Sequence, residues 1–439
     1  MAKEKTGYKK NLGMIILLAF AGSIIYGLPY FRSYYYDAYR SMYHLTNTQM
    51  GLLGSAYGLL GVVSYVIGGV LADKFKAKKL LIISMILTGL GGLLHLVVTS
   101  FHALVMIYGL WGITSLLTFW PALMKVVRTQ GTDEEQSRTY GIFEGSRGVF
   151  NAGHLAVATA IFGVFQAKAM PYVGIKGIIW FYSLAPLIVG ILFIFLLKEP
   201  ERVVEDTSEQ KNKVSWQDIA SVIKMPVMWL IVIMMYTSYT FNMSSYYFTP
   251  YASNVIGVTA VIAAVLTVLA QYVRPFAATL GGFAGDKFGK SQTMAIGYIL
   301  MIVGVLIMDF THAMKSDNRM IFVVAACVLV YVGMYSNFGL YFSFISEGGV
   351  PLNLSGVAIG MACTLGYLPE VLSYIIAGKL LDKNPGYAGY HLNFMYMLVM
   401  GVIGLAVSII WAKTYGKKKT VEQDKELENI SGEPVEVKE

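Results

Sequence analysis

Two short stretches of this chain are near copies of each other: GGVLADKFKAKK at residues 68–79 and GGFAGDKFGKSQ at residues 281–292. In each copy a long apolar run ends in two glycines, three residues follow, and Asp-Lys-Phe comes next. Another apolar run then begins a few residues further on. A short charged turn that recurs between apolar runs predicts a membrane protein that is built from two similar halves.

The composition indicates lipid as the main solvent. Of the 439 residues, 56% are hydrophobic and only 14% are charged, whereas typical soluble domains carry about 25% charged residues. The net charge of +8 does not indicate a nucleic-acid partner, because the basic residues gather in the tails and in short turns rather than along one basic face. Cys327 and Cys363 lie inside apolar runs, so we expect packed thiols and no disulfide.

Twelve apolar runs are long enough to cross a bilayer, which takes about 20 residues in a helix. They cover residues 12–33, 47–71, 79–99, 102–125, 138–165, 177–197, 226–250, 257–284, 291–311, 320–344, 353–379 and 391–413. We therefore predict an all-α membrane protein with twelve transmembrane helices in two six-helix bundles. The predicted parts are a bundle over residues 1–198, a cytoplasmic linker over 199–225, a second bundle over 226–413 and a disordered cytoplasmic tail over 414–439.

The positions of Lys and Arg predict the orientation. The turns on the same side as the N-terminus hold most of these residues, including Lys74 and Lys287, and the opposite side holds few, including Arg40 and Arg319. Because Lys and Arg gather on the cytoplasmic side, we expect both termini in the cytoplasm. The expected location is the cytoplasmic membrane of a prokaryote.

Local patterns predict where some helices begin. Thr46 with Gln49, and Thr132 with Glu135, fit the Ser/Thr-x-x-Glu/Gln capping pattern. The stretch SWQDIASVIK at residues 215–224 predicts a short helix that lies along the membrane surface before the seventh span.

Six plus six helices, a polar middle segment and the repeated turn together resemble the major facilitator superfamily. Its signature after the second helix runs Gly-x-Leu-Ala-Asp-Arg/Lys-x-Gly-Arg/Lys, and Lys76 replaces the second glycine here. The residues that match in the first copy are Gly69, Leu71, Ala72, Asp73 and Lys74, and those in the second copy are Gly282, Asp286, Lys287, Gly289 and Lys290.

The resemblance implies a secondary transporter that works by alternating access, and it covers residues 10–415. It also implies that the turn is a cytoplasmic gating motif, in which Asp73 interacts with the neighbouring half at a helix terminus or with a basic group. The plainer alternative is that Asp73 and Lys74 form a solvated turn.

Charged residues inside spans are costly and are usually functional. Arg274 precedes Asp286 by 12 residues, or about 18 Å along a helix. Arg147 follows Arg138 by nine residues, or about 14 Å. Both arginines are therefore predicted near the bilayer midplane, whereas counting back from Asp73 in the same way leads to Gly61.

The resemblance implies that the fifth and eighth helices meet between the halves, so Arg147 and Arg274 could face one central space. Arginine offers a planar fork of donors for carboxylate or phosphate. Glu144, three residues before Arg147, could instead neutralise it on the same helix face. The predicted substrate-binding set is Arg274, Arg147, Arg32, Asn151, Tyr239 and Asn242.

Three further residues are candidates for binding a coupled proton. They are Glu144, Glu370 and His154. A lone histidine inside a span is more often a hydrogen-bonded packing residue than a proton relay. Arg32 is predicted near the outer mouth, either as a snorkelling residue in an aromatic belt or where the solute enters.

Individual branches of the superfamily match only in part. Organophosphate antiporters are similar in the FWPALMKVVR and SRTYGIFEGSRGVFNAGH regions, but the arginine that they use on the seventh helix is missing here. Oxalate-type antiporters use an arginine on the eighth helix, which Arg274 fits, and a lysine on the eleventh, which is missing before Lys379. Nitrate carriers use an arginine on the second helix, and this second span is uncharged.

The chain carries no G-x-x-x-x-G-K-[ST] motif, no metal cluster and no nucleophile–base motif. We expect no enzyme activity and no cofactor. The sequence predicts a monomeric transporter of a small organic anion, driven by a gradient of solute, protons or a counter-anion. The alternatives are a proton-coupled symporter of a neutral or sugar-like solute, and a transporter-like solute sensor.

Overall fold

A computed structural model describes residues 9–131, 136–197, 216–314, 318–351 and 354–416, and the side chains of 65–74, 136–138, 141, 216 and 267 are outside this description. All regular elements in these ranges are helices. The first six spans contain α1 (Leu12–Ile24), α2 (Gly27–Tyr34), α3 (Tyr36–Met42), α4 (Asn47–Lys74), α5 (Ala77–Val97), α6 (Phe101–Trp111), η1 (Gly112–Phe119), α7 (Trp120–Arg128), α8 (Gln136–Ala167) and α9 (Pro171–Leu196).

The rest of the chain begins with the short helix α10 (Trp216–Ile223), as predicted. The later spans contain α11 (Pro226–Ser245), α12 (Phe248–Tyr251), η3 (Ala252–Ile256), α13 (Ala260–Phe288), α14 (Lys290–Phe310), η4 (Thr311–Ala313), α15 (Arg319–Phe338), α16 (Ser343–Glu347), α17 (Ser355–Gly366), α18 (Pro369–Lys383), α19 (Tyr387–Trp411) and η6 (Ala412–Gly416). Among the described residues, ten helices are long and apolar enough to cross a membrane, and the bent pair α1–α2 makes eleven if it is one span. The 28-residue α4 covers the remaining predicted run.

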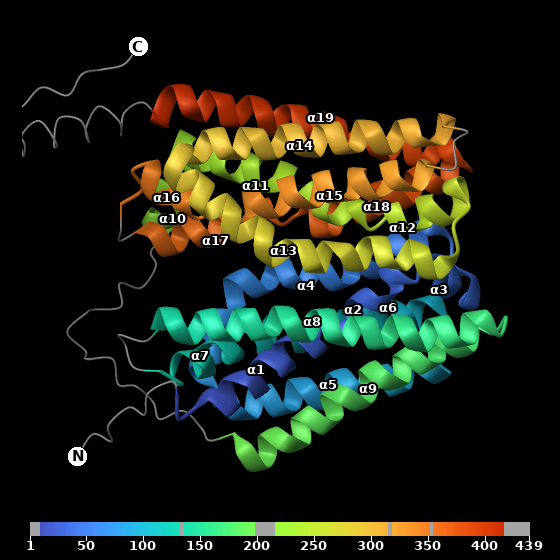
Figure 1. The fold of residues 1–439 in the computed structure, drawn as a ribbon. Coiled ribbons are helices and arrows are strands. Elements are labelled where there is room, and N and C mark those ends of the chain that lie inside the picture. Colours follow the sequence, from blue (N-terminus) through green and yellow to red (C-terminus); the bar gives the residue numbers. More distant parts are fainter. Residues whose placement is uncertain (1–8, 132–135, 198–215, 315–317, 352–353, 417–439) are drawn as a thin grey trace, which may run out of the picture.

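Figure 1 shows α1–α9 in one group and α11–α19 in another, side by side with their axes roughly parallel. The start of α1 and the end of α19 lie at the same end of the molecule, which we call the terminal face. The opposite end, where α3 and α12 lie, is called the far face. Between the two groups, α4 packs against α18, and α8 packs against α13.

Two predicted spans break near a proline. The axes of α1 and α2 differ by 48°, and the break precedes Pro29, whose ring clashes with the carbonyl four residues earlier in a continuous helix. The eleventh span breaks between α17 and α18, where Pro369 is the first residue of the new helix. By contrast, α13 continues through Pro275.

The described residues test several local predictions. The capping box at Thr46 is confirmed, because the Thr46 amide donates to Gln49 Oε1 (2.9 Å) and the Gln49 amide donates to Thr46 Oγ1 (3.1 Å). Cys327 and Cys363 are buried free thiols, also as predicted. The capping pair Thr132 and Glu135, the linker up to residue 215 and the tail after residue 416 lie outside the described residues.

The two copies of the repeated turn differ in backbone conformation. Gly289 ends α13 with a φ of 95°, a conformation that glycine adopts without steric cost. Lys76, at the matching place in the first copy, has an ordinary extended φ of −65°. The replacement of glycine by lysine therefore coincides with a different turn. Asp286 and Lys287 are exposed, and the side chains of Asp73 and Lys74 are outside the described part.

Candidate functional site

A hydrogen bond joins the two halves near the middle of the molecule. Asn151 Nδ2 on α8 donates to Gln271 Oε1 on α13 over 2.8 Å. Because α8 leads away from the terminal face and α13 leads back to it, Arg147 and Arg274 both lie about one helical turn from this bond toward the terminal face. The structure thus brings the two predicted arginines to one level, from opposite halves.

The two arginines have different partners. Arg147 forms an ion pair with Glu144 (Nη2 to Oε2, 2.7 Å), and its guanidinium carbon lies 5.1 Å from the centre of the Trp120 ring. Arg274 is exposed, and its guanidinium carbon lies 5.6 Å from the centre of the Tyr335 ring. Among the described residues no carboxylate lies within 4.0 Å of Arg274. Arg274 is therefore a cation without an ion-pair partner in this set.

Tyr26, at the break between α1 and α2, lies between these charges. Its hydroxyl is within electrostatic range of Arg147, Glu144, Arg274 and Glu370. Its ring packs 6.3 Å from that of Trp120. Charged residues of both halves therefore lie within electrostatic range of one half-buried tyrosine.

Glu370 joins the halves at a second place. Its side chain is 6% exposed, and it accepts hydrogen bonds from the hydroxyls of Tyr30 on α2 (2.7 Å) and Tyr239 on α11 (3.3 Å). The Tyr239 ring packs against the rings of Phe338 and Tyr367. The structure thus brings the predicted residues Tyr239 and Glu370 together. Asn242, one turn further along α11, is half-buried.

Arg32 is not a snorkelling residue of an interfacial belt. Arg32 is 3% exposed, and its guanidinium carbon lies 5.4 Å from the Tyr108 ring centre and 5.0 Å from that of Tyr374. It is neither in an interfacial belt nor at an open mouth, because α18 of the other half covers it. Gly54 leaves the space for it, since a Cβ there would lie 2.3 Å from Arg32 Nη2.

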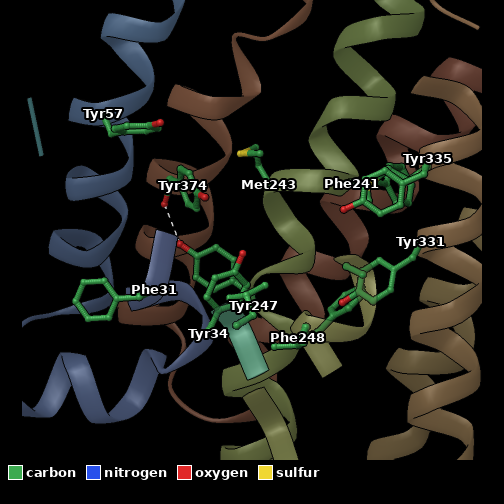
Figure 2. Packing of buried hydrophobic residues seen from close by; sticks show 14 of the residues in the cluster. Phe31, Tyr34, Tyr57, Phe241, Met243, Tyr247, Phe248, Tyr331, Tyr335 and Tyr374 are labelled. Atoms are coloured by element: carbon green, nitrogen blue, oxygen red, sulfur yellow. Dashed lines mark hydrogen bonds between the residues drawn. The ribbon is translucent and has the colours of Figure 1, made fainter. Parts of the chain in front are cut away.

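Figure 2 shows the aromatic packing around this covered region. Tyr374 lies between Tyr57 and Tyr247, and the Tyr247 hydroxyl donates to the Tyr374 carbonyl over 3.2 Å. Phe31 and Tyr34 approach from the first half. Aromatic side chains of both halves therefore fill the space around Tyr374.

His154 lies inside the first half. One ring nitrogen is 3.0 Å from the Tyr182 hydroxyl and the other is 3.0 Å from Ser23 Oγ. Its side chain is 6% exposed. This is the arrangement of a hydrogen-bonded packing residue, and the structure does not bring His154 to the arginines.

Hydrogen bonds between the halves also close the far face. Asp382 at the end of α18 accepts from the backbone amides of Asn47 (2.9 Å) and Thr48 (2.7 Å) at the start of α4. Asp37 on α3 accepts from the side chains of Ser253 and Asn254. In this structure the halves are therefore tied together at the far face.

Sequence reasoning missed four residues of this site: Gln271, Tyr26, Trp120 and Tyr30. Gln271 carried a usable signal, because it is a polar residue in an apolar span, one turn before Arg274. Tyr26, Trp120 and Tyr30 carried no such signal. The chain has 30 tyrosines and 6 tryptophans, and most of them have equally apolar neighbours in the sequence.

The chain is similar to known membrane proteins along nearly its whole length. Inner membrane protein YihN of Escherichia coli (strain K12) is 27% identical over 418 residues, which cover 94% of this chain and 97% of that protein. Inner membrane protein YqcE of the same strain is 25% identical over 407 residues, which cover 92% of this chain and 94% of that protein.

A solved structure has the same fold. It is that of a bacterial homolog to the human lysosomal transporter Spinster, in an inward-facing and unoccupied conformation. It superposes with a TM-score of 0.75 at 15% identity, and it covers 94% of this chain and 99% of that chain. The family model of the Major Facilitator Superfamily matches residues 11–373. With ten candidate spans among the described residues, or eleven with the bent pair α1–α2, and this match, the chain is a multi-pass membrane protein that belongs to the major facilitator superfamily.

Proposed function

We propose that this protein is a secondary transporter that moves a small organic anion, a carboxylate or a phosphorylated metabolite, across the membrane by alternating access. The observation that carries the proposal is the pair of arginines at one level in opposite halves. Arg274 is exposed and lacks a carboxylate partner among the described residues, while Arg147 is already paired with Glu144.

The charge balance of this region supports an anion rather than a cation. Arg147 and Glu144 together carry no net charge, so Arg274 leaves a net positive charge beside Tyr26 when Glu370 is in its neutral form. A cation inside a membrane protein attracts an anion strongly, because the surroundings screen the charge less than bulk water does. The Arg274 guanidinium can hold carboxylate or phosphate oxygens through two parallel hydrogen bonds. Asn151, Tyr239 and Asn242 supply neutral polar groups nearby.

The conformation supports alternating access. The halves are tied at the far face by Asp37 and Asp382, and the distribution of Lys and Arg favours a cytoplasmic terminal face. A closed far face then corresponds to access from the cytoplasm. The similar structure of the Spinster homolog is inward-facing, which supports this assignment. When the far face opens, we expect the Asp73 turn to hold the terminal face closed.

Transport by purified protein in liposomes tests the proposal. A panel of labelled carboxylates, phosphorylated metabolites and neutral sugars is offered to the wild type, to Arg274→Gln, to Arg274→Lys and to Lys176→Gln. Lys176 is an exposed residue of α9, so its replacement removes one positive charge away from the site. We expect anion uptake that falls at least tenfold in Arg274→Gln, partly returns in Arg274→Lys, and stays normal in Lys176→Gln.

A neutral solute coupled to protons is the second candidate. The rings of Tyr239, Tyr367 and Phe338 could pack against a sugar-like body, and Glu370 is a buried carboxyl beside them. Uptake of a neutral sugar that needs a proton gradient, with normal uptake by Arg274→Gln, would refute the anion proposal. Binding of a solute without any transport would instead favour the sensor.

A further inference from the structure

We propose that Glu370 is a proton-binding site whose protonation is linked to closure of the far face. The proposal rests on alternating access, which is part of the proposed function, but not on the identity of the substrate. It arises from a carboxyl group that is enclosed by both halves at the break between α17 and α18.

The enclosure is tight on the side of the first half. A Cβ at Gly58 of α4 would lie 2.6 Å from Glu370 Cγ, and one at Gly61 would lie 3.8 Å from Glu370 Oε2. Tyr30 of the first half and Tyr239 of the second donate to one carboxyl oxygen each. Closing the halves therefore places the carboxyl between α2, α4 and α11.

The groups that face Glu370 are aromatic hydroxyls rather than cations. Within electrostatic range are the hydroxyls of Tyr26, Tyr30, Tyr57, Tyr246, Tyr367 and Tyr374. Among the described residues no Lys, Arg or His lies within 4.0 Å of the carboxyl. Arg32 packs on the ring of Tyr374, and Arg274 lies within electrostatic range of Tyr26 and Tyr367, the two hydroxyls that it shares with Glu370.

Burial without a cation favours the neutral acid. An ionised carboxyl in an apolar site loses several kcal/mol of hydration, and two tyrosine hydrogen bonds stabilise the anion by about 1.5–3 kcal/mol each, against about 0.5–1.5 kcal/mol each for the neutral acid. The first turn of α18 adds less than about 1 kcal/mol in favour of the anion. A neutral carboxylic acid keeps both contacts at a smaller cost, because it can donate one hydrogen bond and accept the other.

Opening the far face changes this balance. Tyr30 and α4 belong to the half that moves away from α18, so the carboxyl loses one donor and gains water. The ionised form is then favoured. By linkage, closing the far face takes up a proton, and opening it releases one. Acid therefore favours the closed far face, and the closed-to-open ratio changes by up to about tenfold per pH unit for one proton.

The experiment measures the distance between two spin labels at the far face, one on each half, as a function of pH and without any substrate. Spin labels are attached to Ser41→Cys on α3 and Lys383→Cys on α18, two exposed residues of opposite halves at this face. Cys327 and Cys363 are buried, so the labels react at the new sites. Pulsed electron paramagnetic resonance in nanodiscs then records the closed and open populations between pH 5 and pH 9.

We expect the open population of the wild type to rise with pH, and Glu370→Gln to stay closed throughout, because glutamine remains neutral. Asp37 and Asp382 also lie at this face and are present in both proteins, so the difference between the two reports Glu370. Asp218→Asn on the short helix α10, at the terminal face, is the matched control for the loss of one carboxyl and is expected to keep the wild-type pH response. An equal response in wild type and Glu370→Gln, or no response in the wild type, overturns the proposal. Failure of anion uptake leaves this result intact.

Discussion

Gly51 allows the far face to close, and a single methyl group there should open it. In the structure, α4 and α18 approach so closely that a Cβ at Gly51 would lie 2.2 Å from the carbonyl oxygen of Tyr374 and 2.9 Å from its carbonyl carbon. Both atoms belong to the backbone, so no side-chain rotation relieves the overlap. The Gly51→Ala substitution must therefore push α4 away from α18.

The added methyl group raises the free energy of the closed state only, because α4 and α18 separate when the far face opens. Overpacking by one methyl group typically costs about 1–3 kcal/mol. A cost of about 2 kcal/mol shifts the closed-to-open ratio about thirtyfold, because about 1.4 kcal/mol is a factor of ten. A protein that is mostly closed would then become mostly open at the far face.

The Ser41 and Lys383 spin-label pair measures this shift at one pH. Gly153→Ala on α8 is the matched control, because nothing lies within 4 Å of a Cβ at that glycine. We expect a longer main distance in Gly51→Ala and an unchanged distance in the control. If Gly51→Ala gives the wild-type distance distribution at normal protein yield, the closed packing of α4 on α18 does not control the far face.

Three further predictions concern single side chains. Asp382→Asn should weaken the far-face closure by about 1–3 kcal/mol, because hydrogen bonds from amides to a charged acceptor are lost, and the same label pair should show a larger open population. Tyr30→Phe removes one of the two hydrogen bonds that Glu370 accepts when the far face is closed, so it should need a more acidic pH than the wild type to close, and it should keep a measurable pH response because Glu370 and Tyr239 remain. Thr46→Ala removes the helix cap that Gln49 completes and should lower the unfolding free energy by about 1 kcal/mol, read as a lower midpoint in thermal unfolding of purified protein, while anion uptake stays within twofold.

Some features of the site depend on spacing along one helix, and these were accessible from the sequence. Arg147 and Glu144 lie three residues apart on α8 and form the ion pair that an i,i+3 spacing allows. The common level of Arg147 and Arg274 was also predictable, because a helix rises about 1.5 Å per residue. Counting from the repeated turns was enough to place both near the middle of the fold.

Other features depend on which helix lies opposite, and spacing carries no information about that. Depth alone placed Arg32 near an outer mouth, whereas α18 covers it and packs Tyr374 on its guanidinium. Tyr30 and Glu370 are 340 positions apart in the chain, and only the docking of the two halves brings them together. The break at Pro369 could be anticipated, but not the tyrosines that surround the next residue.

By itself, the sequence determined an all-helical membrane protein with twelve spans and a repeated charged turn, because lipid requires long apolar helices that satisfy their own backbone hydrogen bonds. The tertiary structure decided how each helix is rotated and which helix of the other half it meets. That rotation leaves Arg274 exposed while Glu144 pairs with Arg147, and it encloses Glu370 between two tyrosines. Packing between the halves, in which glycines such as Gly51 and Gly58 permit close contact, sets these neighbours.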